Sequence, residues 1–188
     1  GDSAASGGSL YIRGCITYGD ITENSGGIAG SFIGQNGSII IESCRSYGSI
    51  DSAGGIVGHD CYNTTITNCY STGSITGINS GGITYMDAGH GEDGCTISNC
   101  YSTGAILGNG SGGICGALVP VTSCMVSVYN CYTTGNISGS NSGGICGTVN
   151  NNVSLNISNC YTVGTASTGY IVGGSASVTS FSGRNITN

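Results

Sequence analysis

Residues 65–77 read Thr-Ile-Thr-Asn-Cys-Tyr-Ser-Thr-Gly-Ser-Ile-Thr-Gly, and residues 96–108 repeat them as Thr-Ile-Ser-Asn-Cys-Tyr-Ser-Thr-Gly-Ala-Ile-Leu-Gly. A shorter copy, Asn-Ile-Ser-Asn-Cys-Tyr-Thr-Val-Gly, occupies residues 156–164. Gly-Gly-Ile triplets lie between the copies. Because a unit this small cannot enclose its own apolar face, neighbouring units have to stack on one another. The repeat therefore predicts a solenoid.

Like residues form columns that run through the whole chain. The cysteine column is Cys15, Cys44, Cys69, Cys100, Cys131 and Cys160. The aliphatic column before it is Ile12, Ile41, Ile66, Ile97, Val128 and Ile157, and the one after it is Ile21, Ile50, Ile75, Ile106 and Ile137. Successive ladder cysteines are 25 to 31 residues apart, and the variation falls between Gly-Gly-Ile and the first aliphatic column. A loop on one face is expected to absorb it.

The composition favours short strands over helices. Glycine supplies 37 of the 188 residues, β-branched residues are frequent, and long unbranched side chains are rare. We therefore predict an all-β, right-handed parallel β-solenoid (β-helix) of about six coils with repeats of 25–31 residues. Residues 1–188 are predicted to form a single repeat domain, part of a longer array or of an end-stacked assembly.

The columns also predict which side chains point inward. The aliphatic columns never contain a charge, which indicates that they face the core. The position after the ladder cysteine accepts Arg45, so it is predicted to lie outside and to form an outer aromatic face. That face consists of Tyr70, Tyr101, Tyr132 and Tyr161. The position before the cysteine is mostly Asn, which tolerates a left-handed turn, so we expect a corner there.

These segments resemble a known repeat. GGIVG (54–58), TITNCYSTGSITG, TISNCYSTGAILG and NISNCYTVG are similar to the GLUG motif, over roughly residues 7–173. GLUG repeats occur in arrays in large bacterial surface proteins of the filamentous-haemagglutinin-like adhesin type, and similar versions occur in giant-virus surface proteins. The resemblance implies a surface scaffold. GLUG units often carry Ser where this chain has the ladder cysteine, so the family does not explain the cysteines.

Charge and hydropathy exclude several kinds of partner. The chain has no lysine, only Arg13, Arg45 and Arg184, and a formal net charge of −6, so nucleic-acid binding is not expected. The sequence contains no run of eighteen apolar residues, so membrane insertion is not expected. The ends carry no obvious polar cap and the chain starts at Gly1, which suggests a processed or partial chain. We expect an extracellular or particle-surface location, with other copies, neighbouring segments of a longer protein or glycans as partners.

Eleven cysteines allow more than one arrangement. Residues stacked one coil apart come close enough for a disulfide, so the candidates outside the ladder are Cys115, Cys146, Cys61, Cys95 and Cys124. Alternatively, the cysteines remain free thiols that pack as small apolar groups, and we favour this interpretation for the ladder. No cofactor and no catalytic residue is expected.

A metal site is a further alternative for two loops. His59 and Cys61 follow one Gly-Gly-Ile, and His90 and Cys95 follow the next, so the four can in principle form a tetrahedral zinc site. The carboxylates of Asp87, Glu92 and Asp93 could hold calcium. The competing interpretation is an ordinary solvated loop with a Cys61 to Cys95 bridge.

Three functions fit such a scaffold. The first is a non-enzymatic structural or adhesive module of a filament, surface appendage, adhesin stalk or virion surface, stacking through open solenoid ends. The second is a polysaccharide-binding or polysaccharide-cleaving β-helix, which needs paired carboxylates. The third is an ice-binding solenoid, suggested by the short threonine column Thr72, Thr103 and Thr134. We favour the first, because only the 87–93 loop offers neighbouring carboxylates.

Overall fold

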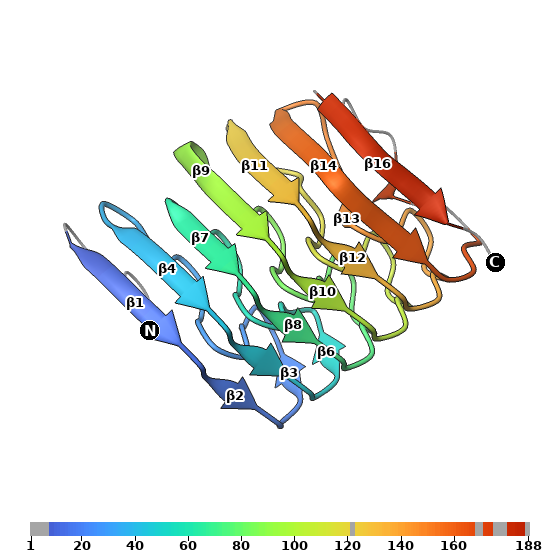
Figure 1. Ribbon diagram of the computed structural model, residues 1–188, viewed down its shortest axis with the longest axis horizontal. Coiled ribbons are helices and arrows are strands. Elements are labelled where there is room, and N and C mark those ends of the chain that lie inside the picture. The colour runs from blue at the N-terminus through green and yellow to red at the C-terminus, as the bar shows by residue number, and fades with distance from the viewer. Residues whose placement is uncertain (1–7, 121–122, 168–170, 175–179, 187–188) are drawn as a thin grey trace.

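The chain folds as a β-solenoid. A computed structural model describes residues 8–120, 123–167, 171–174 and 180–186, with the backbone alone for 91–93 and 180–186. Within those ranges the protein is all-β and has no helix, and parallel strands stack into about five turns. Figure 1 shows β1 at one end of the stack and β16 at the other. The six ladder cysteines mark six successive levels of these turns.

Most strands are short because each coil bends several times. The described strands are β1 (Ser9–Arg13), β2 (Ile16–Thr17), β3 (Ile21–Thr22), β4 (Ser38–Glu42), β5 (Arg45–Ser46), β6 (Ile50–Asp51), β7 (Thr64–Thr67), β8 (Tyr70–Ser71), β9 (Gly91–Ser98), β10 (Tyr101–Ser102), β11 (Cys124–Tyr129), β12 (Tyr132–Thr133), β13 (Cys146–Thr148), β14 (Val153–Val163), β15 (Val172–Gly173) and β16 (Ser180–Ile186).

Equivalent strands of successive coils pair in parallel. One sheet has the order β1-β4-β7-β9, and a second contains β2-β5-β8-β10-β12-β14 with β11 and β16 also paired to β14. In the first sheet the register places Ile41 beside Ile66 and Ile66 beside Ile97. In the second it places Tyr101 between Tyr70 and Tyr132. The pairing confirms the columns read from the sequence.

The aliphatic columns form two separate cores. The larger one contains the column of Ile66 and Ile97 together with ladder cysteines, and the smaller one contains Ile50, Ile75 and Ile106. All five of these isoleucines are fully buried. Each such side chain contributes on the order of 1.5–3 kcal/mol by leaving water.

The predicted corner before each ladder cysteine is confirmed. Asn68, Asn99, Asn130 and Asn159 all have positive φ, between 50° and 55°. This left-handed residue turns the chain so that Ile66 and Cys69, three positions apart, both point into the core. The asparagines also bond to one another along the axis, since Asn130 Nδ2 donates to Asn99 Oδ1 at 3.2 Å.

A polar inner column, missed by the sequence analysis, divides the two cores. It lies two residues after each ladder cysteine and comprises Ser46, Ser71, Ser102, Thr133 and Thr162, all at most 1% exposed. Two neighbouring pairs bond along the axis, with Ser71 Oγ donating to Ser102 Oγ at 3.2 Å and the Thr133 and Thr162 hydroxyls 3.0 Å apart. The second glycine of two Gly-Gly pairs packs against this column: a Cβ on Gly82 would lie 2.7 Å from Ser102 Oγ, and one on Gly113 would lie 2.3 Å from Thr133 Cγ2. Segments from opposite sides of the coil come into contact here, and a residue with a Cβ would overlap its neighbour, which explains why glycine occupies this position.

A second inner serine column stands just before Gly-Gly-Ile. Ser80, Ser111 and Ser142 are fully buried. The Ser111 hydroxyl donates to Gly77 O at 2.8 Å and accepts from Ser80 N at 3.0 Å. Each of these serines thus satisfies backbone groups at the turn that a purely apolar side chain would leave without a partner.

Substitution of Gly113 tests the contact between the walls. We expect Gly113→Ala to lower the free energy of unfolding by about 1–3 kcal/mol or more, because its Cβ would overlap Thr133 and the backbone. Gly19→Ala is the matched control, because a Cβ at Gly19 has no atom within 4 Å. Urea denaturation of both variants measures the difference, and equal stabilities would contradict this packing.

Candidate functional site

Four titratable side chains lie on the loops that follow two successive Gly-Gly-Ile turns. We call them the His59 cluster, which consists of His59, Asp60, Asp87 and His90. The loops are held together by their backbones, with Asp60 N donating to Met86 O at 3.3 Å and Gly89 N to Cys61 O at 2.9 Å. Asp60 and Asp87 both adopt positive φ, near 50° and 54°, so each stands at a tight turn. The coil stacking therefore brings the four side chains together.

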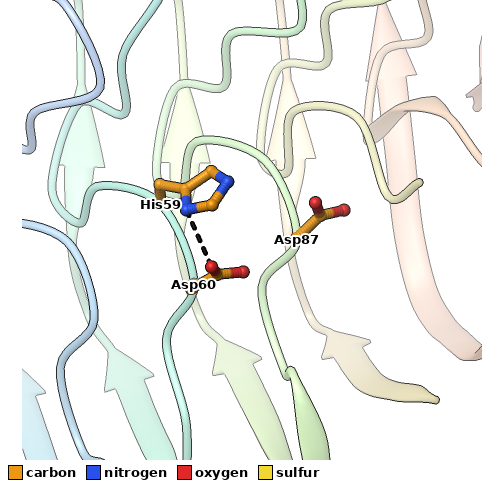
Figure 2. Close-up of side chains that lie close together, drawn as sticks. All are labelled: His59, Asp60 and Asp87. Carbon is orange, nitrogen blue, oxygen red and sulfur yellow. Dashed lines mark ion pairs between the residues drawn. The ribbon is translucent and has the colours of Figure 1, made fainter. Parts of the chain in front are cut away.

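Asp60 is the centre of the cluster. Its Oδ2 lies 2.9 Å from His59 Nδ1, and its Oδ1 lies 3.0 Å from His90 Nδ1. Figure 2 shows Asp87 on the adjacent loop, beside the pair of His59 and Asp60. The Asp87 Oδ1 accepts a hydrogen bond of 2.8 Å from Val119 N on the following coil. Asp60 and Asp87 are buried, at 6% and 8% exposure.

The electrostatics of the two carboxylates differ. Burial acts to raise the pKa of Asp60, but hydrogen bonds from His59 and His90 outweigh it and hold that pKa below its ordinary value. The hydrogen bond to Asp60 in turn raises the pKa of His59. Burial raises the pKa of Asp87, and the neighbouring Asp60 raises it further. Asp60 is thus stabilised as an anion, whereas the hydrogen bond from Val119 N offsets only part of the desolvation cost of ionised Asp87.

The four residues proposed for zinc do not come together as one ligand set. In the described part of the chain, the one group of three or more His, Cys, Asp or Glu with ligand atoms within 4.8 Å of one another is His59, Asp60 and Asp87. Cys61 and Cys95 point instead into the core, where their sulfur atoms lie 3.4 Å apart. The side chains of Glu92 and Asp93 lie outside the described part of the structure.

All eleven cysteines are within the described residues and are free thiols. Ten are buried, and Cys15 is exposed. The other candidates for bridges are neighbours in the core: Cys115 and Cys146 pair across adjacent coils, and Cys124 Sγ donates to Ala88 O at 2.7 Å. The spatial neighbours expected from the repeat are therefore present, as thiols.

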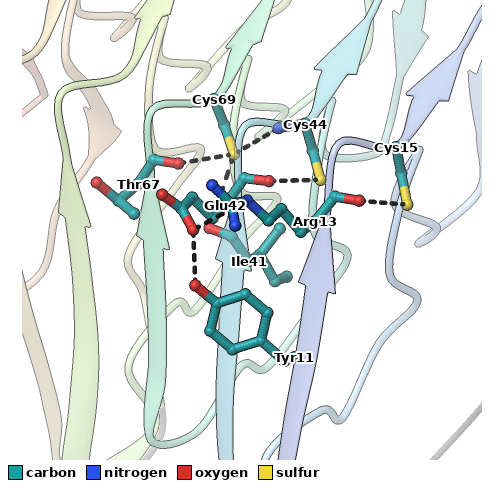
Figure 3. Close-up of polar contacts among 8 residues, drawn as sticks. All are labelled: Tyr11, Arg13, Cys15, Ile41, Glu42, Cys44, Thr67 and Cys69. Atoms are coloured by element: carbon teal, nitrogen blue, oxygen red, sulfur yellow. Dashed lines mark hydrogen bonds and ion pairs between the residues drawn. The ribbon is translucent and has the colours of Figure 1, made fainter.

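The ladder cysteines serve as hydrogen-bonding groups as well as core residues. Figure 3 shows their thiols donating to the carbonyl two residues earlier, for example Cys44 Sγ to Glu42 O at 3.3 Å and Cys69 Sγ to Thr67 O at 3.2 Å. Cys69 Sγ also accepts from Cys44 N at 3.4 Å, which joins the two levels. Burial raises the pKa of Cys44 to about 11 and the pKa of Cys100 well above its ordinary value. Hydrogen bonds from the neighbouring Cys100 instead lower the pKa of Cys69 and lower the pKa of Cys131 to about 4. Burial therefore shields the ladder thiols from reagents in solvent, except at the exposed Cys15.

The outer tyrosines form a continuous row. Neighbouring rings of Tyr70, Tyr101, Tyr132 and Tyr161 stack with centroids 4.7–5.1 Å apart and planes within 11° of parallel. Tyr18 and Tyr47 extend the row, although they stand two positions later in their repeats, which is why the column pattern missed them. Because ring faces cover one another, the row presents mainly ring edges and hydroxyls, and a sugar ring has little room to stack between them.

The structure is thus that of a β-solenoid repeat protein whose interior is closely packed and contains buried thiols. In the described part of the chain, the His59 cluster contains the group of side chains that could hold a metal ion. Comparison of the chain with protein-family models, with curated proteins and with solved structures gives no match. No helix among the described residues has the length and apolar character needed to span a membrane.

Thiol accessibility tests the arrangement of the cysteines. At low protein concentration under native conditions, we expect one thiol per chain, Cys15, to react quickly with an aromatic disulfide reagent, because the other ten are buried. Unfolding in denaturant without reductant should expose all eleven. A total below eleven after unfolding would instead reveal disulfides.

Substitution of Cys100 separates its two roles. Cys69 N donates to Cys100 Sγ at 3.4 Å, and Cys100 Sγ donates to Ser98 O at 3.1 Å. We expect Cys100→Val to lower the free energy of unfolding by about 1–3 kcal/mol, because it leaves these buried backbone groups without their partner. Cys100→Ser retains a donor and an acceptor and should be less destabilising. The reverse order in urea denaturation would show that only apolar packing matters.

Proposed function

We propose that this chain is a non-enzymatic structural module of an extracellular or particle surface, such as a filament, appendage, adhesin stalk or virion surface. Its role is to add length and rigidity and to join neighbouring coils end to end. The support comes from the interior, where the columns serve packing and backbone hydrogen bonding. The resemblance to GLUG repeats favours the same class.

The first level of the solenoid carries the proposal. Leu10 belongs to the column of Ile39 and Cys95, which are at most 4% exposed, yet Leu10 itself is 36% exposed. Similarly, Cys15 is exposed whereas its column neighbour Cys44 is buried. Among the described strands, β1 pairs with β4 alone. A further coil laid on this level would bury the same columns that the next levels already bury.

The shape of this level also suits another coil. An apolar depression there is lined by Leu10, Ile12, Ile28, Ile33 and Ile39 among others. Strand edges and aliphatic side chains together make the surface that β-strand addition uses. We therefore propose that the partner is another solenoid coil, either from a second copy of this chain or from a neighbouring segment of a longer protein.

An enzymatic alternative has less support. Glycan hydrolysis needs two carboxyl groups flanking the scissile bond with access to substrate. Asp60 and Asp87 are buried, and Asp60 is engaged by two histidines. The threonine column proposed for ice binding does face outward, with Thr72, Thr103 and Thr134 exposed, but it holds three residues between Tyr47 and Val163.

The proposal is tested by assembly of the purified chain. We expect concentration-dependent association in sedimentation velocity, with rods longer than one chain in negative-stain images. Leu10→Asp should reduce this association, because it places a charge on the exposed first level. Ile40→Asp is the matched control, since Ile40 is 37% exposed but lies on the outer face of the next coil. A chain that stays monomeric at all concentrations, or equal effects of the two variants, would contradict end-to-end joining.

A further inference from the structure

The His59 cluster consists of imidazoles and carboxylates, which are common metal ligands. Two buried carboxylates, Asp60 and Asp87, lie on adjacent coils in a chain without lysine. The imidazoles of His59 and His90 are the basic groups that contact Asp60. Buried carboxylates ordinarily have a full counter-ion or a metal ion as partner.

The ligand atoms already converge. One atom each from His59, Asp60 and Asp87 lies within 4.8 Å of the other two. Zinc bonds to imidazole nitrogen and carboxylate oxygen at about 2.0–2.2 Å, which requires ligand atoms roughly 3.3–3.6 Å apart in a tetrahedral site. A separation of up to 4.8 Å therefore has to shorten by at most roughly 1.2–1.5 Å, which rotations of the side chains can supply.

We propose that His59, Asp60 and Asp87 bind one divalent transition-metal ion of the Zn²⁺ class, which ties one coil of the solenoid to the next. One imidazole and two carboxylates suit Zn²⁺ and its neighbours in the first transition row, whereas Ca²⁺ prefers six to eight oxygen ligands. The imidazole binds as the neutral base, so any proton on the coordinating nitrogen is released to solvent. This site does not depend on the proposed end-to-end assembly.

His90 is a positioning residue in this site. Its Nδ1 lies 3.0 Å from Asp60 Oδ1, on the oxygen that His59 does not contact. Its ring also stacks on Tyr62, with centroids 5.2 Å apart, which fixes the imidazole. Such a second partner orients a metal-binding carboxylate and strengthens it as a ligand.

The site has access to solvent at His59. A surface cavity lined by Asn24, Ser31, Phe32 and His59 opens beside the ring. The imidazole is held between Phe32 and Tyr85, with ring centroids 5.5 and 6.2 Å away. A small hydrated ion can therefore reach the ring, while the flanking aromatic side chains limit its rotation.

Titration of Zn²⁺ into the metal-free chain tests the site directly. The Cys15→Ser background removes the exposed thiol, and isothermal titration calorimetry should then show one ion bound per chain. His59→Gln and Asp87→Asn should weaken binding at least about 100-fold, and His90→Gln by about 10–100-fold. Asp20→Asn, which changes an exposed carboxylate in the first coil, should bind as the parent does. No binding by the parent, or unchanged binding in His59→Gln and Asp87→Asn, overturns the proposal.

Two further readouts keep the test decisive if a variant folds poorly. Asp87→Asn keeps the oxygen that accepts from Val119 N and removes a buried charge, so in EDTA at neutral pH it should melt at or above the parent temperature. Zn²⁺ should raise the melting temperature of the parent but not of this variant. Bound Co²⁺ should give visible d–d bands without the near-ultraviolet charge-transfer band of thiolate ligands. A thiolate band would assign the ion to the cysteines and overturn the site.

Discussion

Hydrogen bonding in register between successive coils is the constraint on which this structure depends. A strand of two residues, such as β8 or β10, has no stability of its own and persists because a copy lies on each side. Length can therefore vary only where coils do not pair as strands. The step from Cys44 to Cys69 is 25 residues and the next is 31. Much of the difference lies in β9, which has eight residues where β7 has four, and β7 pairs with only Cys95–Ser98 of β9.

The interior shows how a chain with few charges can bury polar side chains. Serine, threonine and cysteine columns run along the axis beside the isoleucines, and their members bond to the backbone or to a copy in the next coil, as Ser71, Ser111 and Cys69 do. Ser46 Oγ and Thr84 Oγ1 are the two buried side-chain oxygens in the described residues without such a partner. The repeat explains why few buried oxygens lack a partner, because a hydrogen bond that fits between two coils can recur between equivalent coils.

The two proposals concern different parts of the same stack. The first proposal rests on Leu10 and Cys15, which are exposed at the first described level although their columns are buried at other levels. The His59 cluster lies on the side of the stack, between two coils, and a metal ion there would act along the same axis as the hydrogen bonds. Both contacts would strengthen a rod, and they can be separated because they use different residues: Leu10 in one, and His59, Asp60 and Asp87 in the other.

The sequence by itself determined the solenoid, the inward isoleucines, the outward tyrosines and the left-handed corner at asparagine. These follow from what stands at one position in every repeat, such as Arg45 in the column of Tyr70, which excludes an inward orientation. The tertiary structure decided the rest, since it depends on which coils meet. The buried Ser102 column needed the contact with the opposite glycine wall, and Tyr47 joined the row only because its ring reaches Tyr70 from another position. The repeat spacing predicted that the loops of His59 and Asp87 stack, but only the geometry of their turns decided that Asp60 and Asp87 lie beside His59. The same stacking turned Cys61 and Cys95 away from the histidines and into the core.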